Sequence, residues 1–311
     1  MLFKILTLLI KARKLMKLSL LVFLFTCSSL NAGSLDKGIE AYKAKDYRAA
    51  LNEFEAFAND GVPVAQNYLG TIFYLGQGVP QNYNLAIKWF TLAAEQGYKL
   101  AQFNLGVMFN DGQGTPQNYL EAAKWFTLAA EQGHSYAQFN LGYMFSEGEG
   151  VPQDYKKAFK WITLSAEQGA DKAQFNLGAI YESGRGVPQN YKRMIKWYML
   201  AAEQGYSEAQ FYIGLMYFKG KGVPKDFNKA LKWMTLSADQ NYKLAQLKLS
   251  QIYSESGDVP QDYVMAHMWA NIIASESNTS LLRDTLAGKM TLDQIDQAQQ
   301  KASDWFDKNN N

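Results

Sequence analysis

The sequence predicts an all-α protein that is built as a solenoid of 36-residue helix-turn-helix repeats. Six of the seven prolines and six of the seven tryptophans recur every 36 residues, without one insertion or deletion. Each period contains two stretches in which apolar residues have helical spacing. The clearest copy runs from Ala137 to Gly169, and near-copies begin at Ala65, Ala101, Ala173, Ala209 and, with more changes, Ala245.

The first 32 residues differ in composition from the repeats and predict a signal peptide. They contain five basic residues and no acidic one, and the apolar run Leu18 to Phe25 is shorter than the roughly 20 residues that span a bilayer. Ala32 is the best cleavage site, and the true start can be Met1 or Met16. We therefore expect an exported protein, periplasmic or secreted, with no membrane span after leader removal. The alternative is lipid attachment at Cys27.

Removal of this leader changes the formal net charge from +2 to −3. The remaining basic residues are spread over the repeats and form no stripe of the kind that nucleic-acid-binding proteins carry. Nucleic acid is therefore excluded as a partner. The single cysteine of the chain lies inside the leader, so no disulfide is expected in the mature protein.

Residues 33–61 predict a shortened hairpin, similar to a tetratricopeptide hairpin, that caps the N-terminal end of the array. Leu35, Ile39 and Tyr42 have helical spacing. Asp46 can cap a second helix that follows almost without a loop. The unit lacks four residues of the later loops, which is typical of a capping element rather than a full repeat.

Six full repeats are expected in residues 62–277, each with two helices joined by a Gly-x-Gly-Val-Pro loop. In the first repeat the helices are predicted at about Ala65 to Tyr74 and Tyr83 to Gln96. The loop glycines can adopt the positive φ that ends a helix, and the proline prevents the helix from continuing. Asn82 can cap the second helix, and Gly97 can end it.

The apolar positions of the repeat predict how the helices pack. A glycine in the first helix, such as Gly70, leaves room for a large side chain, which indicates knobs-into-holes packing between successive hairpins. The recurring tryptophan of the second helix, such as Trp89, is expected in the core rather than on a ligand-stacking surface.

Residues 278–311 predict a C-terminal helical cap and a frayed tail. Thr291 and Gln294 have the spacing of a capping box, which places the start of a helix at Leu292. The chain beyond Lys301 is expected to fray.

Short motifs recur in register from Ala65 to Trp269, namely L-G-x-M-F, G-x-G-V-P, K-W and A-A-E-Q-G. In these motifs the chain resembles the Sel-one-like repeat (SLR) family, whose members are related to tetratricopeptide repeats. The resemblance implies a right-handed α/α superhelix that works as a protein-binding scaffold, often exported in bacteria. One cysteine-rich branch of the family implies penicillin binding and β-lactamase activity, but this sequence lacks the paired cysteines of that branch.

The sequence indicates no catalytic, cofactor or metal site. The only histidines, His134 and His267, do not have the spacing of a metal-ligating pair, and no G-x-S-x-G elbow occurs. Glu147 and Glu149 lie in one exposed loop, where burial cannot raise a carboxylate pKa for acid catalysis. The paired loop glycines are not followed by G-K-[ST], so they indicate turns rather than a phosphate site. The protein is therefore not expected to be an enzyme or to hold a cofactor.

Partner binding is expected where the repeats differ while their frame stays constant. Positions three and four apart on a first helix share one face, and in tetratricopeptide-type superhelices the first helices line the concave groove. An amide ladder of Asn104, Asn140 and Asn176 can bind the backbone of an extended peptide there. The alternative is that these amides bond neighbouring backbone and that the tyrosines pack between repeats. The predicted partner-binding residues are Tyr68, Thr71, Asn104, Val107, Tyr136, Asn140, Tyr143, Asn176, Tyr212 and Leu215.

These observations lead to one main functional hypothesis and two alternatives. The main hypothesis is an exported scaffold that binds a peptide segment or a partner domain in its concave groove. The first alternative is a hydrolase-like activity on cell-wall material or β-lactams, as in the cysteine-rich relatives. The second alternative is a purely structural spacer.

Overall fold

Turn residues set the helix boundaries in the computed structural model of the protein, which describes residues 35–255, 257, 259–274 and 277–309. In the first repeat, Pro63 occupies the first position of α3 (Pro63–Leu75), and Gly76 ends this helix with φ 66°. The side chain of Asn82 accepts a hydrogen bond from the backbone N–H of Leu85 at 3.0 Å and so caps α4 (Tyr83–Glu95). The predicted cap and turn residues of the repeat are confirmed.

The described chain divides into two units within the third repeat. Unit 1 comprises the residues up to Met144 together with Gly148–Pro152, and unit 2 comprises Phe145–Glu147 and the residues from Gln153 onward. Unit 1 contains a helix over residues 35–43, followed by α2 (Tyr47–Asn59), α3, α4, α5 (Lys99–Asp111) and α6 (Tyr119–Glu131), while α7 (Ser135–Glu147) ends at the division.

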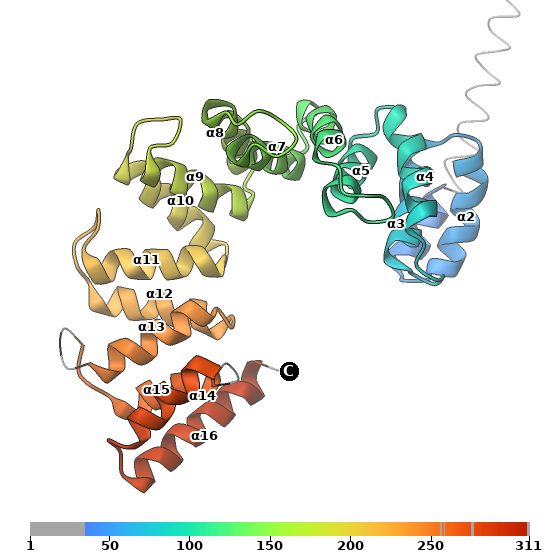
Figure 1. Cartoon of the computed structure of the whole chain (residues 1–311). Coiled ribbons are helices and arrows are strands. Elements are labelled where there is room, and N and C mark those ends of the chain that lie inside the picture. Colours follow the sequence, from blue (N-terminus) through green and yellow to red (C-terminus); the bar gives the residue numbers. More distant parts are fainter. Residues whose placement is uncertain (1–34, 256, 258, 275–276, 310–311) are drawn as a thin grey trace, which may run out of the picture. The chain divides into compact units, whose positions relative to one another are not determined.

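Unit 2 continues with helices of the same kind. Its helices are α8 (Tyr155–Glu167), α9 (Asp171–Ser183), α10 (Tyr191–Glu203), α11 (Ser207–Lys219), α12 (Phe227–Asp239), α13 (Lys243–Ser254), α14 (Tyr263–Ile272), α15 (Ser277–Ala287) and α16 (Leu292–Asn309). Within each unit, from α2 to α6 and from α8 to α14, every helix packs against the next one along the chain (Figure 1). Throughout the described residues the only regular elements are helices, which confirms the predicted all-α repeat solenoid.

At Gly70, Gly106, Gly178 and Gly214, the first helix receives a large side chain from the second helix of the same hairpin. A Cβ atom at Gly106 on α5 would lie 2.7 Å from the ring of Phe126 on α6. Gly178 and Tyr198 have the same relation in unit 2, at 2.5 Å. The predicted knobs-into-holes packing therefore exists, but its place was wrong: it joins the two helices of one hairpin instead of successive hairpins.

The tryptophans take a smaller part in the core than the sequence predicts. Trp125 and Trp269 are buried, but Trp89, Trp161, Trp197 and Trp233 are only half-buried. The residue that follows the tryptophan, such as Phe90 or Phe126, is the one that is almost fully buried. The lysine before the tryptophan lies over its ring in several repeats, at 5.2–5.4 Å from the ring centroid, so the K-W pair forms a cation–π contact near the surface.

A buried glutamine links each hairpin to its neighbour within a unit. Gln102 is 3% exposed and donates its amide to the backbone oxygen of Ala94 at 3.1 Å. It also accepts a hydrogen bond from Gln132 at 2.7 Å. The same arrangement recurs at Gln66, Gln174 and Gln210, with donors Gln96, Gln204 and Gln240. The glutamines of the A-Q and E-Q-G motifs are therefore structural, because they satisfy buried polar groups between hairpins.

The C-terminal helix α16 closes unit 2 by packing into a core that it shares with α13 and α14. Thr291 and Gln294 exchange two hydrogen bonds, at 2.9 and 3.3 Å, which confirms the predicted capping box at the start of α16. The helix then continues to Asn309. Trp305 attaches this part of the helix to the rest of unit 2, because it is buried and its indole N–H donates to Asp239 at 2.9 Å. Fraying of the chain beyond Lys301 stays a prediction.

The fold lowers the pKa of both histidines. His134 caps α7 by accepting a hydrogen bond from the N–H of Ala137 at 3.2 Å, and its ring stacks on Phe103. Burial and the charge of Lys99 lower the pKa of His134 below its ordinary value. His267 is 2% exposed, and burial again is the main cause that lowers its pKa.

We expect the protein to lose stability as the pH falls below about 6.5, the ordinary pKa of histidine in an unfolded chain. In that range the unfolded chain binds protons that the folded protein rejects, because both histidine pKa values are lowered on folding. Thermal unfolding followed by circular dichroism between pH 7.5 and 5 measures the slope. Other repeats have a tyrosine at the position of His134, namely Tyr98 and Tyr206, so His134→Tyr is a conservative variant and should reduce this slope. An unchanged slope in this variant would show that His134 does not contribute to the pH dependence of stability.

Candidate functional site

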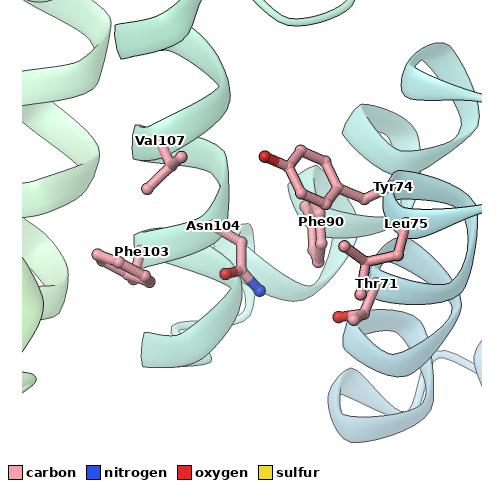
Figure 2. A pocket seen from close by; sticks show the side chains of 7 residues that line it. All are labelled: Thr71, Tyr74, Leu75, Phe90, Phe103, Asn104 and Val107. Atoms are coloured by element: carbon pink, nitrogen blue, oxygen red, sulfur yellow. The ribbon is translucent and has the colours of Figure 1, made fainter. Parts of the chain in front are cut away.

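An apolar cavity of about 350 Å³ lies between the first helices α3 and α5 of unit 1. Thr71, Tyr74 and Leu75 reach it from α3, and Asn104 reaches it from α5 (Figure 2). The remaining lining residues are Phe90, Phe103 and Val107. Three of the predicted partner-binding residues, namely Thr71, Asn104 and Val107, are therefore brought together at one cavity.

The polar side chains of the cavity are held by hydrogen bonds within the protein. The amide nitrogen of Asn104 donates to the side-chain oxygen of Asn67 at 3.1 Å. The hydroxyl of Thr71 donates to the backbone oxygen of Asn67 at 2.9 Å. Phe90, Leu75 and Val107 supply apolar wall, so the cavity suits an apolar group.

Tyr74 holds one side of the cavity in place. Its hydroxyl donates to the side-chain oxygen of Gln113 at 2.6 Å, which joins α3 to the loop of the following repeat. Burial raises the pKa of Tyr74, and the nearby carboxylate of Asp111 contributes to the increase. On α5, Asp111 lies one helical turn beyond Val107, which lines the cavity.

Unit 2 has a smaller cavity at the equivalent place, with a volume of about 90 Å³. Three repeats after Asn104, the sequence has Tyr212, and this side chain lines the small cavity. The Tyr212 ring also contacts the rings of Phe175 and Tyr198, with centroids 5.5 and 5.8 Å apart. A tyrosine at this position thus occupies space that an asparagine leaves open in unit 1.

An ion pair borders the small cavity in unit 2. Lys221 donates to one carboxylate oxygen of Glu182 at 2.7 Å, and the Tyr198 hydroxyl donates to the other at 3.0 Å. The hydrogen bond to Glu182 raises the pKa of Lys221. Burial and the same carboxylate raise the pKa of Tyr198 far above its ordinary range, so the phenol stays protonated. Glu182 and Lys221 occupy the positions that Tyr74 and Gln113 occupy in unit 1.

The other predicted residues of unit 1 differ in how far they are exposed. Tyr68 is half-buried and stacks on Phe54, with ring centroids 4.7 Å apart. Tyr136 is 58% exposed and Tyr143 is 46% exposed. Asn140 is half-buried, and within the described residues its side chain forms no hydrogen bond.

In unit 2, Asn176 donates its amide to the backbone oxygen of Lys172 at 2.8 Å. Tyr212 is 36% exposed, and Leu215 is half-buried against the core of the unit. Asn104 and Asn176 therefore both use their amide nitrogen inside the protein, which leaves their oxygens as the acceptors toward a ligand.

Sequence reasoning missed the cavity residues Tyr74, Phe90 and Phe103. Phe90 is a core residue, and its ring also forms part of the cavity wall. The sequence does contain a signal for Tyr74. The residue type at its position changes between repeats, and the residue type 39 positions later changes with it. The pairs Tyr74–Gln113 and Glu182–Lys221 are both complementary, although their chemistry differs.

The described residues contain no group of three or more His, Cys, Asp or Glu side chains that could hold a metal ion. None of the helices among them is both long and apolar enough to cross a bilayer.

Comparisons with known proteins agree with the repeat architecture. The sequence profile of the Sel1 repeat matches residues 63–98, 99–134, 135–169, 171–206, 207–242 and 243–278. The solved structure of a Sel1 repeat protein from Oxalobacter formigenes is 36% identical, covers 76% of this chain and 95% of that chain, and gives a TM-score of 0.71. A protective antigen of uropathogenic Escherichia coli that displays an SLR fold is 25% identical, covers 89% of this chain and 76% of that chain, and gives a TM-score of 0.57. No curated protein matches the chain. Six consecutive matches over most of its length show that the chain belongs to the Sel1 repeat family.

Proposed function

We propose that the protein is a non-enzymatic scaffold that binds a peptide segment or a small domain of another protein on the exposed face of its first helices. Sel1 repeats are commonly scaffolds for protein–protein interaction, which supports a protein partner in general terms. The observation that carries the proposal is the apolar cavity between α3 and α5, which contains three variable residues of that face.

Large apolar side chains are exposed around this cavity in unit 1. Leu75 is 50% exposed and Leu100 is 39% exposed. Tyr136, on the next first helix, is 58% exposed. Exposed apolar patches with aromatic side chains are typical of protein-binding surfaces, where tyrosines often dominate the binding energy.

The asparagines of the face supply polar groups for a peptide backbone. The carbonyl oxygens of Asn104 and Asn176 remain as acceptors, because their nitrogens donate to Asn67 and Lys172. Among the described residues, no hydrogen bond involves the side chain of Asn140, so its amide N–H groups and its oxygen are all available to a partner. Such amides can pair with the N–H and C=O groups of an extended segment. Export through the predicted leader would place this binding outside the cytoplasm.

The test is a triple Asn→Ala variant at residues 104, 140 and 176. Peptides are first selected with the wild-type mature protein from a phage-displayed random library, and their affinities are then measured by fluorescence anisotropy. We expect the triple variant to bind at least tenfold more weakly, since each lost hydrogen bond contributes about 1 kcal/mol.

The control variant carries Asn84→Ala and Asn228→Ala, two exposed asparagines on the second helices α4 and α12. It should bind like the wild type. Because Asn104 also bonds Asn67, the thermal midpoint of each variant is measured as well. Equal loss of binding in the triple variant and the control, or loss only in proportion to unfolding, would refute the proposal.

A further inference from the structure

We propose that the cavity between α3 and α5 is the anchor subsite of the binding surface, which takes one aromatic or leucine side chain of a partner segment that carries a lysine or arginine nearby. This inference rests on the proposed function and adds the chemistry of the partner. Three features of unit 1 carry it: the apolar wall of the cavity, the acceptor oxygen of Asn104, and the carboxylate of Asp111.

The wall favours a large apolar side chain over a charged one. The volume of about 350 Å³ is at the lower end of ligand pockets and exceeds what a small side chain fills. The nearest polar groups, on Thr71 and Asn104, already donate to Asn67. None of the residues that line the cavity is charged. A charged group inside it would therefore lose its water without touching a counter-charge, whereas an apolar group gains from leaving water.

The surroundings favour an anchor that belongs to a longer chain. The cavity adjoins exposed Leu75, and Leu100 lies one turn before Asn104 on α5, so a chain leaving the cavity would cover these apolar side chains. Among the described residues, no hydrogen bond reaches the side-chain oxygen of Asn104. This oxygen can therefore accept a backbone N–H of the segment.

Asp111 favours a basic residue next to the anchor. It lies one helical turn beyond the cavity-lining residue Val107 on α5, so the two side chains share one face of the helix. Within the described residues it forms no ion pair, and its one hydrogen bond comes from Asn110 at 2.8 Å. No charged residue occurs in α3, and residues 35–144 and 148–152 contain eleven acidic and seven basic side chains. A cation of the partner is thus attracted by Asp111 without opposition from α3.

Unit 2 provides natural replacements for the two key positions. Three repeats later, Tyr212 stands at the position of Asn104, and Lys219 stands at the position of Asp111. The cavity there measures about 90 Å³. The repeat frame therefore accepts a tyrosine and a lysine at these positions, so Asn104→Tyr and Asp111→Lys are variants that the fold should tolerate.

The experiment starts from a phage-displayed random dodecapeptide library and the purified mature protein. We expect the selected peptides to have one feature in common: an aromatic residue or leucine, and a lysine or arginine no more than about four residues away from it. At that separation the basic side chain can reach Asp111 while the apolar side chain occupies the cavity. Synthetic fluorescein-labelled copies of a selected peptide are then compared with copies in which the anchor is alanine or the basic residue is glutamate. Each change should weaken binding about tenfold.

The protein variants test the same contacts from the other side. The Asn104→Tyr protein should bind the selected peptide about tenfold more weakly than the wild type does. Its affinity for the peptide with alanine at the anchor should equal that of the wild type. Asp111→Lys should reverse the charge preference and bind the glutamate peptide better than the lysine peptide. Asn84→Tyr and Glu95→Lys, both at exposed positions of α4, are the matched controls and should change neither preference.

The outcomes separate this inference from the proposed function. If peptides bind but share no apolar anchor, or if Asp111→Lys leaves the charge preference unchanged, the anchor subsite is refuted while the scaffold function stands. If the asparagine variants of the proposed function also fail to change peptide binding, the first-helix face is refuted as a whole. If no peptide is enriched, both proposals are overturned for peptide partners.

Discussion

Gly106→Ala lowers the free energy of unfolding by about 2 kcal/mol and the thermal midpoint by about 5 °C. The new methyl group would lie 2.7 Å from the ring of Phe126, which is 1% exposed and cannot move into open space. Overpacking of this kind costs about 3 kcal/mol, and the better helix propensity of alanine offsets about 1 kcal/mol of it. Differential scanning calorimetry of the wild type and the variant measures the change.

Two variants show whether the loss comes from this contact. Gly288→Ala adds a methyl group whose nearest neighbour is 3.6 Å away, so it should leave the midpoint unchanged. Phe126→Leu in the Gly106→Ala background should recover part of the loss, because the smaller side chain makes room for the methyl group. A Gly106→Ala protein as stable as the wild type would show that the glycine is not needed for close approach.

The sequence predicted the repeat frame because each of its boundary signals is local. Asn82 and Gly76 act through hydrogen bonds and backbone angles within a few residues, so their roles follow from the chain alone. The partner of Gly70 could not be identified in the same way. Helical spacing shows which face a residue is on, but Phe90 of the same hairpin and a side chain of the next hairpin are equally compatible with that face.

The candidate site was predictable only in part, for a similar reason. Thr71, Asn104 and Val107 were found because they vary on one helix face, and the structure brings them to one cavity. The cavity itself depends on how much space the side chain at each position leaves between adjacent repeats. Asn104 leaves about 350 Å³, whereas Tyr212 borders only about 90 Å³ at the equivalent place. Such differences arise from contacts between repeats and have no local signal in the sequence.

Tyr68 shows how a neighbouring element changes the role of a variable residue. By its position it shares the face of Asn104, but the N-terminal hairpin places Phe54 against it, with ring centroids 4.7 Å apart. Tyr42 of the same hairpin lies 5.1 Å from the Tyr68 ring. Much of the aromatic surface of Tyr68 is therefore used inside unit 1, and the face available to a partner is shifted toward α5 and α7.

Trp305→Ala destabilises the C-terminal end of unit 2 by about 3 kcal/mol. The indole is buried in the core that contains Trp269 and Leu249, with the two tryptophan ring centroids 6.3 Å apart. Its N–H also donates to Asp239 at 2.9 Å, a bond that spans 66 residues of the sequence. Truncation removes the apolar contact and leaves a cavity, and α16 loses its hydrogen bond to Asp239 on α12.

Phe306→Ala is the matched control for this effect, because Phe306 is the adjacent aromatic residue and is 38% exposed. Its loss should change stability by less than about 1 kcal/mol. Hydrogen exchange followed by mass spectrometry gives the local result: Trp305→Ala should speed exchange in α16 and α14, while α9 and α10 keep their protection, since repeats contact only their neighbours. If α16 exchanges rapidly even in the wild type, the C-terminal segment frays as its polar sequence suggests, and Trp305 does not hold it in solution.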